Sequence, residues 1–180
     1  MATELQRRKL EKVFASFDVD QDGVIDELDI TAMAQIWCDT YEVPPRSEGW
    51  RKIHGRAHAM WRRIRGSTEA DGTKRVTRQA WVAWIDEPGF EDFVETAAIP
   101  FSMAVFEVAD SDRDGRINAR EMLAAQSKSG MSEEETDRVF ERLDTDRDGY
   151  VTGPEYAQAA REFYLSADPE APGNVIAGDL

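Results

Sequence analysis

The sequence contains very little cysteine and no long apolar run. Cys38 is the single cysteine among 180 residues, which excludes a disulfide within the chain and is typical of proteins from a reducing compartment. No apolar stretch approaches the roughly 20 residues that a membrane-spanning helix needs. The N-terminal stretch MATELQRRKLEKVF also lacks the apolar segment of a secretion signal. We therefore expect a cytoplasmic protein without membrane insertion.

Positive charge is scarce relative to negative charge. The chain has 36 acidic and 22 basic residues, which gives a formal net charge of −14. This balance argues against general affinity for nucleic acid. Hydrophobic residues make up 41% of the chain and aromatic residues 9%. That content is enough to bury a core, so the chain is not a disordered acidic tail.

The sequence does contain one acidic motif three times. The motif reads DVDQDGVIDELD at 18–29, DSDRDGRINARE at 110–121 and DTDRDGYVTGPE at 144–155. It matches the twelve-residue calcium loop D-x-[DN]-x-[DN]-G-x5-E of helix–loop–helix hands, except that Asp29 replaces the final glutamate of the first loop. Three matches in one chain are a specific signal. We call these segments loops I, III and IV.

The loops predict three calcium sites. Calcium takes oxygen ligands, and a loop of this kind supplies them from positions 1, 3, 5, 9 and 12 and from the main-chain carbonyl of position 7. Site I would use Asp18, Asp20, Asp22, Val24, Asp26 and Asp29. Site III would use Asp110, Asp112, Asp114, Arg116, Asn118 and Glu121. Site IV would use Asp144, Asp146, Asp148, Tyr150, Thr152 and Glu155.

Asp29 distinguishes site I from the other two. Its side chain is one methylene shorter than glutamate, so it should supply fewer oxygens to the ion. Magnesium demands near-octahedral geometry with fewer ligands than calcium. Site I should therefore bind calcium more weakly and tolerate magnesium better. The alternative is that Asp26, at position 9, fully compensates.

A fourth hand is expected between residues 30 and 109, because such hands normally occur in pairs. If Val76 is the apolar eighth position, the loop runs over 69–80, with Glu69, Asp71 and Thr73 at positions 1, 3 and 5, Lys74 at position 6 and Ala80 at position 12. If Gly72 is instead the turn glycine, Arg78 takes position 12. Neither register supplies the closing carboxylate. Hand II is therefore predicted to bind no metal.

Helical periodicity flanks every loop. Thr3 is expected to cap the first helix, and Ser132 with Glu135 has the pattern of a capping box. The predicted fold is all-α, with four hands in two pairs packed into a compact domain. Short two-strand pairings should join the paired loops, with Ile25 facing Val76 and Ile117 facing Val151. The expected divisions are a first hand pair at 1–87, a linker at 88–100, a second hand pair at 101–165 and a tail at 166–180.

This pattern resembles calerythrin and the sarcoplasmic calcium-binding proteins. The resemblance spans nearly the whole chain and includes DPEAPGN in the tail, and 17 arginines against 5 lysines look actinobacterial. It implies a compact, all-helical protein whose two hand pairs pack face to face. Members of this family act mainly as cytosolic calcium buffers, although some prokaryotic relatives are proposed sensors. Aspartate at position 12 of the first hand also occurs in the family.

Two functions follow from these observations. The leading hypothesis is a monomeric calcium buffer or transporter, and the alternative is a sensor that docks a partner protein on binding calcium. Sensors expose methionine-rich grooves, whereas the six methionines here are scattered and five tryptophans indicate an aromatic core. The sequence contains no nucleophile–base pair, phosphate loop or HExxH motif, so no enzyme is expected.

One segment departs from the acidic character of the chain. Residues 46–78 hold ten Lys or Arg and three acids. This segment would either be attracted to the acidic hands of the same molecule or form a docking face for an acidic partner. The first interpretation is favoured.

Overall fold

The protein is helical apart from two short strand pairs. The computed structural model describes residues 1–68, 74–126 and 131–178. Its elements are α1 (Glu4–Phe17), β1 (Val24–Ile25), α2 (Glu27–Thr40), α3 (Glu48–Thr68), β2 (Val76–Thr77), α4 (Arg78–Ala83), η1 (Trp84–Asp86), α5 (Phe90–Phe93), η2 (Val94–Ala98), α6 (Ile99–Ala109), β3 (Arg116–Asn118), α7 (Ala119–Gln126), α8 (Glu133–Leu143), β4 (Tyr150–Thr152), α9 (Gly153–Leu165) and η4 (Pro172–Val175). The predicted all-α fold of four hands is confirmed. Among the described residues, no helix combines the length and apolar character of a membrane span.

Local sequence determines several helix ends. The Thr3 side chain accepts a hydrogen bond from the Gln6 N–H, and the Gln6 side chain accepts one from the Thr3 N–H, which completes a capping box. Ser132 and Glu135 form the predicted box at the start of α8. These contacts satisfy N–H groups that have no partner within the helix. The two caps predicted from the sequence are therefore confirmed.

Each pair of loops is joined by a two-strand antiparallel ladder. Ile25 lies opposite Val76 in the ladder of β1 with β2, and Ile117 lies opposite Val151 in that of β3 with β4. All four side chains are buried. Both predicted pairings are confirmed, and the first one establishes Val76 as the eighth position of loop II.

Loop II consequently follows the register that begins at residue 69. Thr77, at position 9, caps α4 by accepting a hydrogen bond from the Ala80 N–H at 3.2 Å. Lys74, at position 6, has a φ of 61°, in the left-handed region that glycine holds at this position of the other loops. Position 12 is Ala80, which has no carboxylate. The predicted positions Glu69, Asp71 and Thr73 lie outside the described residues.

The segment 88–100, predicted to connect the two hand pairs, is helical from Phe90 onward. The helix α5, the π-helical turn η2 and α6 follow one another without a break. Pro100 is the second residue of α6 and lies in its first turn, although the helical backbone already runs through η2 before it. Proline has no N–H to donate. Here it follows η2, a π-helical turn in which each hydrogen bond spans five residues. The division of the chain at 88–100 stays a prediction.

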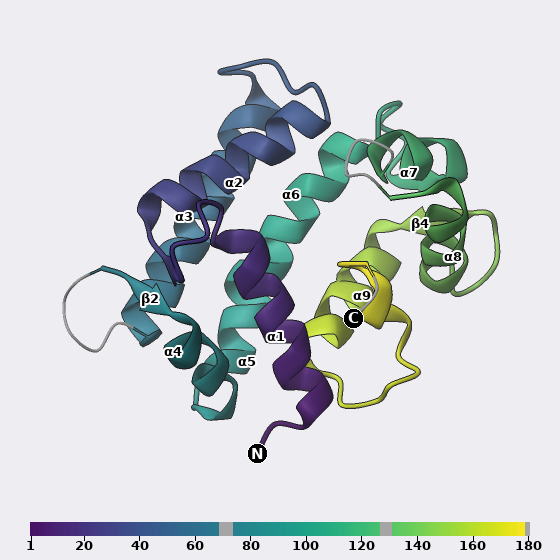
Figure 1. Ribbon diagram of the computed structural model, residues 1–180. Helices are drawn as coiled ribbons and strands as arrows, with labels where there is room; N and C mark the ends of the chain where they lie inside the picture. Colours follow the sequence, from purple (N-terminus) through teal and green to yellow (C-terminus); the bar gives the residue numbers. More distant parts are fainter. Residues whose placement is uncertain (69–73, 127–130, 179–180) are drawn as a thin grey trace.

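The core extends across both hand pairs. Figure 1 shows α6 crossing the middle of the molecule, between α2 and α3 on one side and α7, α8 and β4 on the other. The larger apolar cluster contains buried residues of α1–α6 together with Ala160, Phe163 and Tyr164 of α9. The smaller cluster lies within hands III and IV. Because α6 and α9 contribute to both clusters, packing changes in one hand pair reach the other.

Polar side chains of α1 attach this helix to the end of α9. The buried Lys9 Nζ donates to the carbonyl oxygens of Glu162 (3.3 Å) and Ser166 (3.0 Å). The Gln6 Nε2 donates to the carbonyl oxygen of Leu165 at 2.7 Å. The last carbonyls of a helix lack partners within the helix, and a cation there also interacts favourably with the helix dipole. The first helix of hand I thereby caps the last helix of hand IV, although burial lowers the pKa of Lys9.

The tail lies against hands III and IV. The Gly173 N–H donates to Glu162 Oε2 at 3.0 Å, and the buried Asn174 Nδ2 donates to main-chain carbonyl oxygens earlier in the tail. Val175 and Ile176 pack against the smaller apolar cluster. These two residues cover apolar surface of hands III and IV.

The first testable prediction concerns the contact between the tail and α9. A Cβ atom on Gly173 would lie 2.2 Å from the carbonyl oxygen of Ala159. Gly173→Ala should therefore displace η4 and lower the free energy of unfolding by about 1–3 kcal/mol. Urea denaturation of the calcium-loaded protein measures this change. The matched control is Gly55→Ala in α3, where a Cβ would meet nothing within 4 Å and stability should rise by about 0.5–1 kcal/mol. Equal effects of the two variants would contradict the close contact of η4 with α9.

Candidate metal centres

Loops I, III and IV each bring carboxylates together. The side-chain oxygens that lie within 4.8 Å of one another come from Asp18, Asp20 and Asp22, from Asp110, Asp112 and Glu121, and from Asp144, Asp146 and Glu155. All of these residues are predicted ligands. Like charges at such separations destabilise one another, and a divalent cation would relieve the repulsion. The arrangement is consistent with three calcium sites.

The position-1 carboxylates are held by the turn of each loop. The glycine at position 6 has a φ of 88° in all three loops, a conformation that favours glycine. Its N–H donates to Oδ2 of the position-1 aspartate, from Gly23 to Asp18 at 3.1 Å, from Gly115 to Asp110 at 2.8 Å and from Gly149 to Asp144 at 2.9 Å. The position-1 aspartates are buried. Each loop therefore positions its first ligand through the main chain.

The position-7 residues begin the strands of the ladders. Val24, Arg116 and Tyr150 are the first residues of β1, β3 and β4. Their main-chain N–H groups donate to the aspartates at position 5, over distances of 3.0, 3.1 and 2.9 Å. The ladders thus fix the places of these residues, while carbonyl coordination of an ion by them stays a prediction.

The position-9 residues cap the helices that leave the loops. The side chain of Asp26 accepts a hydrogen bond from the Leu28 N–H at 2.8 Å. Asn118 accepts one from the Glu121 N–H at 3.1 Å, and Thr152 accepts one from the Glu155 N–H at 3.4 Å. From the sequence, these side chains are expected only to bind the metal. The capping role could have been recognised from the spacing of positions 9 and 12, which is that of a capping box.

The glutamates at position 12 bind the main chain of their own loops. Glu155 Oε1 accepts from the Thr145 N–H at 2.9 Å, and Oε2 accepts from the Thr152 N–H at 2.9 Å. Burial opposes ionisation, but these hydrogen bonds outweigh it and lower the pKa of Glu155 to about 2. Hydrogen bonds of the same pattern lower the pKa of Glu121. Both side chains are therefore ionised at neutral pH, as calcium ligands must be.

Asp29 makes the same kind of contact with a shorter side chain. Its Oδ1 accepts from the Val19 N–H at 3.0 Å, and its Oδ2 accepts from the Asp26 N–H at 2.9 Å. Burial raises the pKa of Asp29, opposite to the direction found for the two glutamates. Within the described residues, Asp29 does not join the close group of loop I oxygens, whereas Glu121 and Glu155 join theirs. This geometry favours a smaller contribution of Asp29 to the metal.

The basic segment 46–78 forms ion pairs with acids elsewhere in the chain. Three such pairs are Lys52 with Glu107, Arg63 with Asp92, and Arg75 with Asp22. Exposed pairs of this kind contribute little stability individually, but they favour the intramolecular interpretation of the positive charge. Arg75 is a residue that the sequence analysis did not connect with site I, because its partner lies 53 positions away.

Comparison with known proteins agrees with this geometry. The model of an EF-hand domain pair matches residues 102–161, and the model of a single EF hand matches residues 10–33. No curated protein sequence matches significantly. A Streptomyces coelicolor calcium-binding protein is 30% identical to this chain. Its structure is described as the basis for prokaryotic calcium-mediated regulation. The match covers 88% of this chain and 97% of that one, with a TM-score of 0.73.

More distant structures share the fold. The sarcoplasmic calcium-binding protein from amphioxus is 17% identical over all of both chains, with a TM-score of 0.73. Calcium-loaded apo-aequorin from Aequorea victoria is 18% identical over 93% of this chain and 94% of that one, with a TM-score of 0.76. At these identities the likeness concerns the fold alone.

The geometry of Asp29 generates the second prediction. Asp29→Glu should bring a second oxygen to the cation of site I, because glutamate at position 12 binds calcium through both of its oxygens. Calcium affinity at site I should rise by about tenfold, and competition by millimolar magnesium should decrease there. Calorimetric titration with and without magnesium measures both effects. Glu121→Asp is the reciprocal control and should weaken site III. Overlapping titrations of wild type and Asp29→Glu would show that Asp26 or a water already compensates.

Proposed function

Because this chain belongs to the EF-hand family of calcium-binding proteins, we propose that it is a calcium buffer or transporter with three working sites. The ions would be held by the ligands that the sequence predicts in loops I, III and IV. Sites III and IV would bind calcium through the paired oxygens of Glu121 and Glu155. Site I would bind calcium more weakly and admit magnesium. Loop II would remain without metal, since Ala80 replaces its closing carboxylate.

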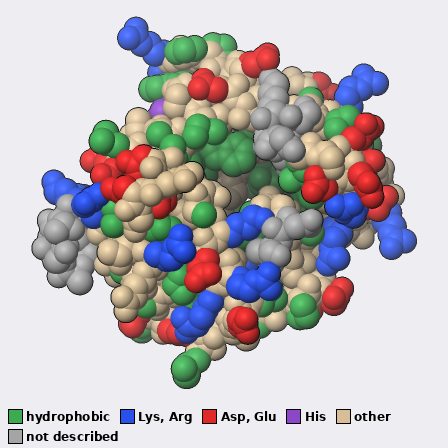
Figure 2. Space-filling model, viewed as in Figure 1, with side chains coloured by type: hydrophobic (Ala, Val, Ile, Leu, Met, Phe, Trp, Pro, Cys, Tyr) green, Lys and Arg blue, Asp and Glu red, His purple; other side chains and the backbone are tan. Residues whose placement is uncertain are grey.

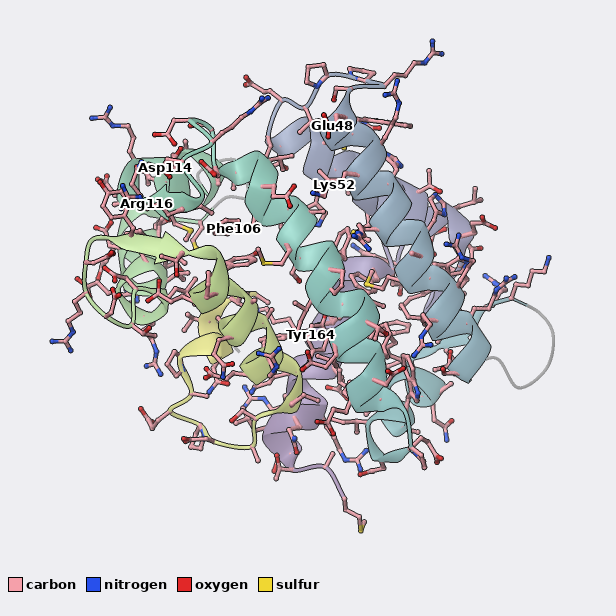
Figure 3. The ribbon with its side chains drawn as sticks, turned by 180° about the vertical axis from the view of Figure 1, so that it is seen from behind. Glu48, Lys52, Phe106, Asp114, Arg116 and Tyr164 are labelled. Atoms are coloured by element: carbon pink, nitrogen blue, oxygen red, sulfur yellow. The ribbon has the colours of Figure 1, made fainter. Side chains whose placement is uncertain are left out.

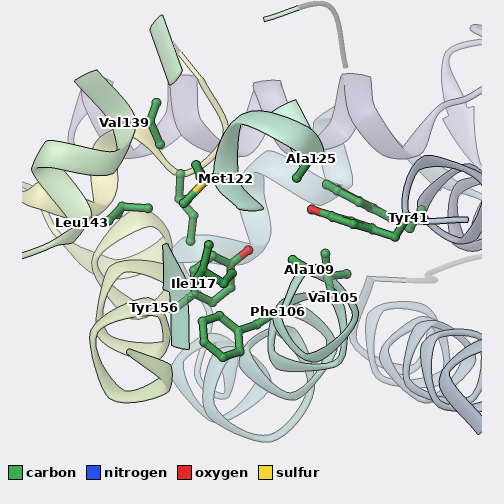
Figure 4. Close-up of a pocket in the computed structure, with 12 residues that line it drawn as sticks. Tyr41, Val105, Phe106, Ala109, Ile117, Met122, Ala125, Val139, Leu143 and Tyr156 are labelled. Carbon is green, nitrogen blue, oxygen red and sulfur yellow. The ribbon is translucent and has the colours of Figure 1, made fainter. Parts of the chain in front are cut away.

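The observation that carries the proposal is the closed packing of hands III and IV. The apolar cavity within this pair has a volume of only about 40 Å³ and includes side chains such as Phe106, Met122 and Tyr156. Figure 4 shows Tyr41, from the end of α2, reaching this cavity from the N-terminal half. Trp37 and Ile176 also line it. This filling by the protein's own residues supports a buffer, because a sensor would leave the corresponding groove to its target.

Interactions at the surface support the same proposal. Figure 2 shows acidic and basic side chains side by side at both edges of the molecule, with apolar side chains in a recess between the two halves. The ion pairs of the basic segment engage acids of the same chain. No acidic partner is needed to account for these three cations. We propose that the protein works as a monomer without a nucleic-acid partner.

The proposal extends to the compartment and to the absence of catalysis. Cys38 is buried and free, and burial raises the pKa of its thiol. Such a thiol fits a reducing cytoplasm and does not serve as a nucleophile. Among the described residues, the groups of His, Cys, Asp or Glu side chains that could share a metal ion are those of loops I, III and IV. We propose that the protein binds and releases calcium without catalysing a reaction.

A calcium sensor is the second candidate. A groove of about 660 Å³ separates the connection between α2 and α3 from the end of α6, and Asp110 of site III belongs to its lining. Figure 3 shows Glu48 and Lys52 on α3, facing this region. A partner seated there would contact a metal loop directly. The Streptomyces relative, described in terms of calcium-mediated regulation, supports this alternative.

The third prediction is a stoichiometry of three calcium ions per chain. Calorimetry and equilibrium dialysis at saturating calcium should give this number, because loops I, III and IV have carboxylate clusters and position 12 of loop II is Ala80. Glu121→Gln should abolish high-affinity binding at site III and leave the other two sites occupied. A crystal of the saturated protein with an ion in loop II, or without one in loop III, would contradict the proposal.

The fourth prediction separates a buffer from a sensor. A ligand that binds only the native state adds RT ln(1 + [L]/Kd), or about 4 kcal/mol per site at a thousandfold excess over Kd. Three such contributions match the roughly 5–15 kcal/mol stability of an ordinary domain. The calcium-free protein should therefore keep helices but pack loosely, and it should bind a dye that reports exposed apolar surface. Calcium should release the dye.

The sensor alternative predicts the opposite dye response. A well-packed calcium-free protein would gain dye when calcium opens a groove. Near-ultraviolet circular dichroism, recorded in parallel, reports whether the aromatic core becomes ordered on calcium addition. Dye gained together with an unchanged aromatic signal would overturn the buffer assignment.

A further inference from the structure

The carboxylates at position 5 differ among the three sites in their positive neighbours. In each loop, one oxygen of this aspartate accepts the N–H of position 7. The donors are Val24 for Asp22, Arg116 for Asp114 and Tyr150 for Asp148. The second oxygen, Oδ2, remains for a cation. In sites I and III an arginine already occupies this oxygen.

At site I the arginine comes from the neighbouring hand. Arg75 lies directly before β2, whose Val76 pairs with Ile25 of β1. Its Nη2 forms an ion pair with Asp22 Oδ2, and both side chains are partly exposed. In the register set by the ladder, Arg75 is position 7 of loop II. A residue of the loop predicted to bind no metal is thus in contact with a predicted ligand of site I.

At site III the arginine comes from the loop itself. Arg116, also at position 7, folds back so that its Nε donates to Asp114 Oδ2 at 2.9 Å. Its guanidinium lies 3.8 Å from the centre of the Tyr150 ring, an additional cation–π contact. Figure 3 shows Asp114 and Arg116 next to each other. The hydrogen bond to Asp114 is the main cause of the raised pKa of Arg116. The arginine therefore has two attachments, and one of them is a predicted calcium ligand.

Site IV lacks this arrangement. Its position 7 is Tyr150, and within the described residues no lysine or arginine forms an ion pair with Asp148. Arg147 lies beside Asp148 in the sequence and makes no ion pair there either. Asp148 Oδ2 therefore has no ion-pair partner among these residues, although the charge of Arg116 also attracts Asp148 from a greater distance. The three loops, which share one motif, thus differ at the second oxygen of position 5 as well as at position 12.

We infer that Arg75 and Arg116 are internal counter-cations that calcium must displace from Asp22 and Asp114, so that site IV fills before sites I and III. A guanidinium is always charged and binds carboxylate oxygens; it therefore competes with the metal for the same atom. The inference deepens the proposed function and rests on it. It gives hand II a role in setting the affinity of site I, in addition to its pairing with hand I.

The hydrogen bonds of the loops provide a reporter for each site. The N–H groups of Gly23, Gly115 and Gly149 donate to the position-1 aspartates, so binding of metal by these aspartates should shift the three amide resonances separately. A calcium titration that is monitored by nuclear magnetic resonance then reports the occupancy of each site. In the wild-type full chain, the resonance of Gly149 should move at the lowest calcium concentration.

Two arginines of loop III form a matched pair of variants. Arg116→Gln and Arg113→Gln remove the same charge from the same loop, but among the described residues only Arg116 forms an ion pair with a ligand. Arg116→Gln should raise calcium affinity at site III by about two- to fivefold, the range expected when an exposed ion pair is removed. Arg113→Gln should change it less. Equal changes of calcium affinity in the two variants would mean that only the net charge of the loop matters, and they would overturn the inference.

Arg75→Gln tests the contact between hands II and I. Affinity should rise by about two- to fivefold at site I, while site IV stays unchanged. Arg75→Lys, which keeps the charge, should restore at least part of the wild-type affinity. A loss of affinity at site I in Arg75→Gln would mean that Arg75 orients Asp22 for the metal, and it would overturn the inference.

The side-chain resonances of the arginines provide an independent readout. Filling of sites I and III should shift the Nε signals of Arg75 and Arg116 as their contacts with Asp22 and Asp114 break. Arginine signals that do not respond while the glycine reporters shift would also overturn the inference. Failure of three-site calcium binding, on which the proposed function rests, is distinguishable, because none of the three glycine reporters would then respond to calcium in wild type.

Discussion

Repulsion among the carboxylates of loops I, III and IV is the constraint on which the rest of the structure depends. The fold opposes it with hydrogen bonds from the main chain. Glu155 and Glu121 accept from N–H groups at both ends of their loops and sit at the start of a helix, where negative charge is favoured. These contacts keep the carboxylates ionised and in place, but they leave the mutual repulsion of the cluster. A divalent cation is the natural complement to that remaining charge.

The two hand pairs are joined through polar and apolar contacts. The repulsion among the carboxylates of one pair can therefore affect the other. Lys9 and Gln6 of α1 satisfy the last carbonyls of α9, while α6 and α9 contribute to both apolar clusters. Moving hand I away from hand IV would expose these carbonyls and leave the buried ammonium of Lys9 without partners, which is unfavourable. These contacts give a cation bound in one pair a physical route by which it would stabilise packing in the other. Such coupling suits a molecule that closes as a whole when it is loaded.

Features encoded by neighbouring residues could be predicted from the sequence, whereas features encoded by distant ones could not. The loops, the Ser132–Glu135 capping box and the pairing of Ile25 with Val76 follow from local spacing and from the known pairing of hands. Pro100 lies in the first turn of α6, a place that its chemistry favours, but the helical run that precedes it through η2 does not follow from local sequence. The contact of Arg75 with Asp22 depends on how two hands face each other. The approach of Gly173 to α9 likewise arises only in the folded tail.

Hand II keeps the pairing of such a loop without the carboxylate that closes a metal site. Its ladder with β1 uses main-chain groups and the buried side chain of Val76, which persist although Lys74 replaces the glycine of position 6 and Ala80 replaces the closing acid. Once the loop has no cation to hold, positive side chains become tolerable in it. They are even favourable there, because the ladder keeps Arg75 beside the acids of loop I. The loop without a closing carboxylate thus places a permanent positive charge next to the acids of loop I.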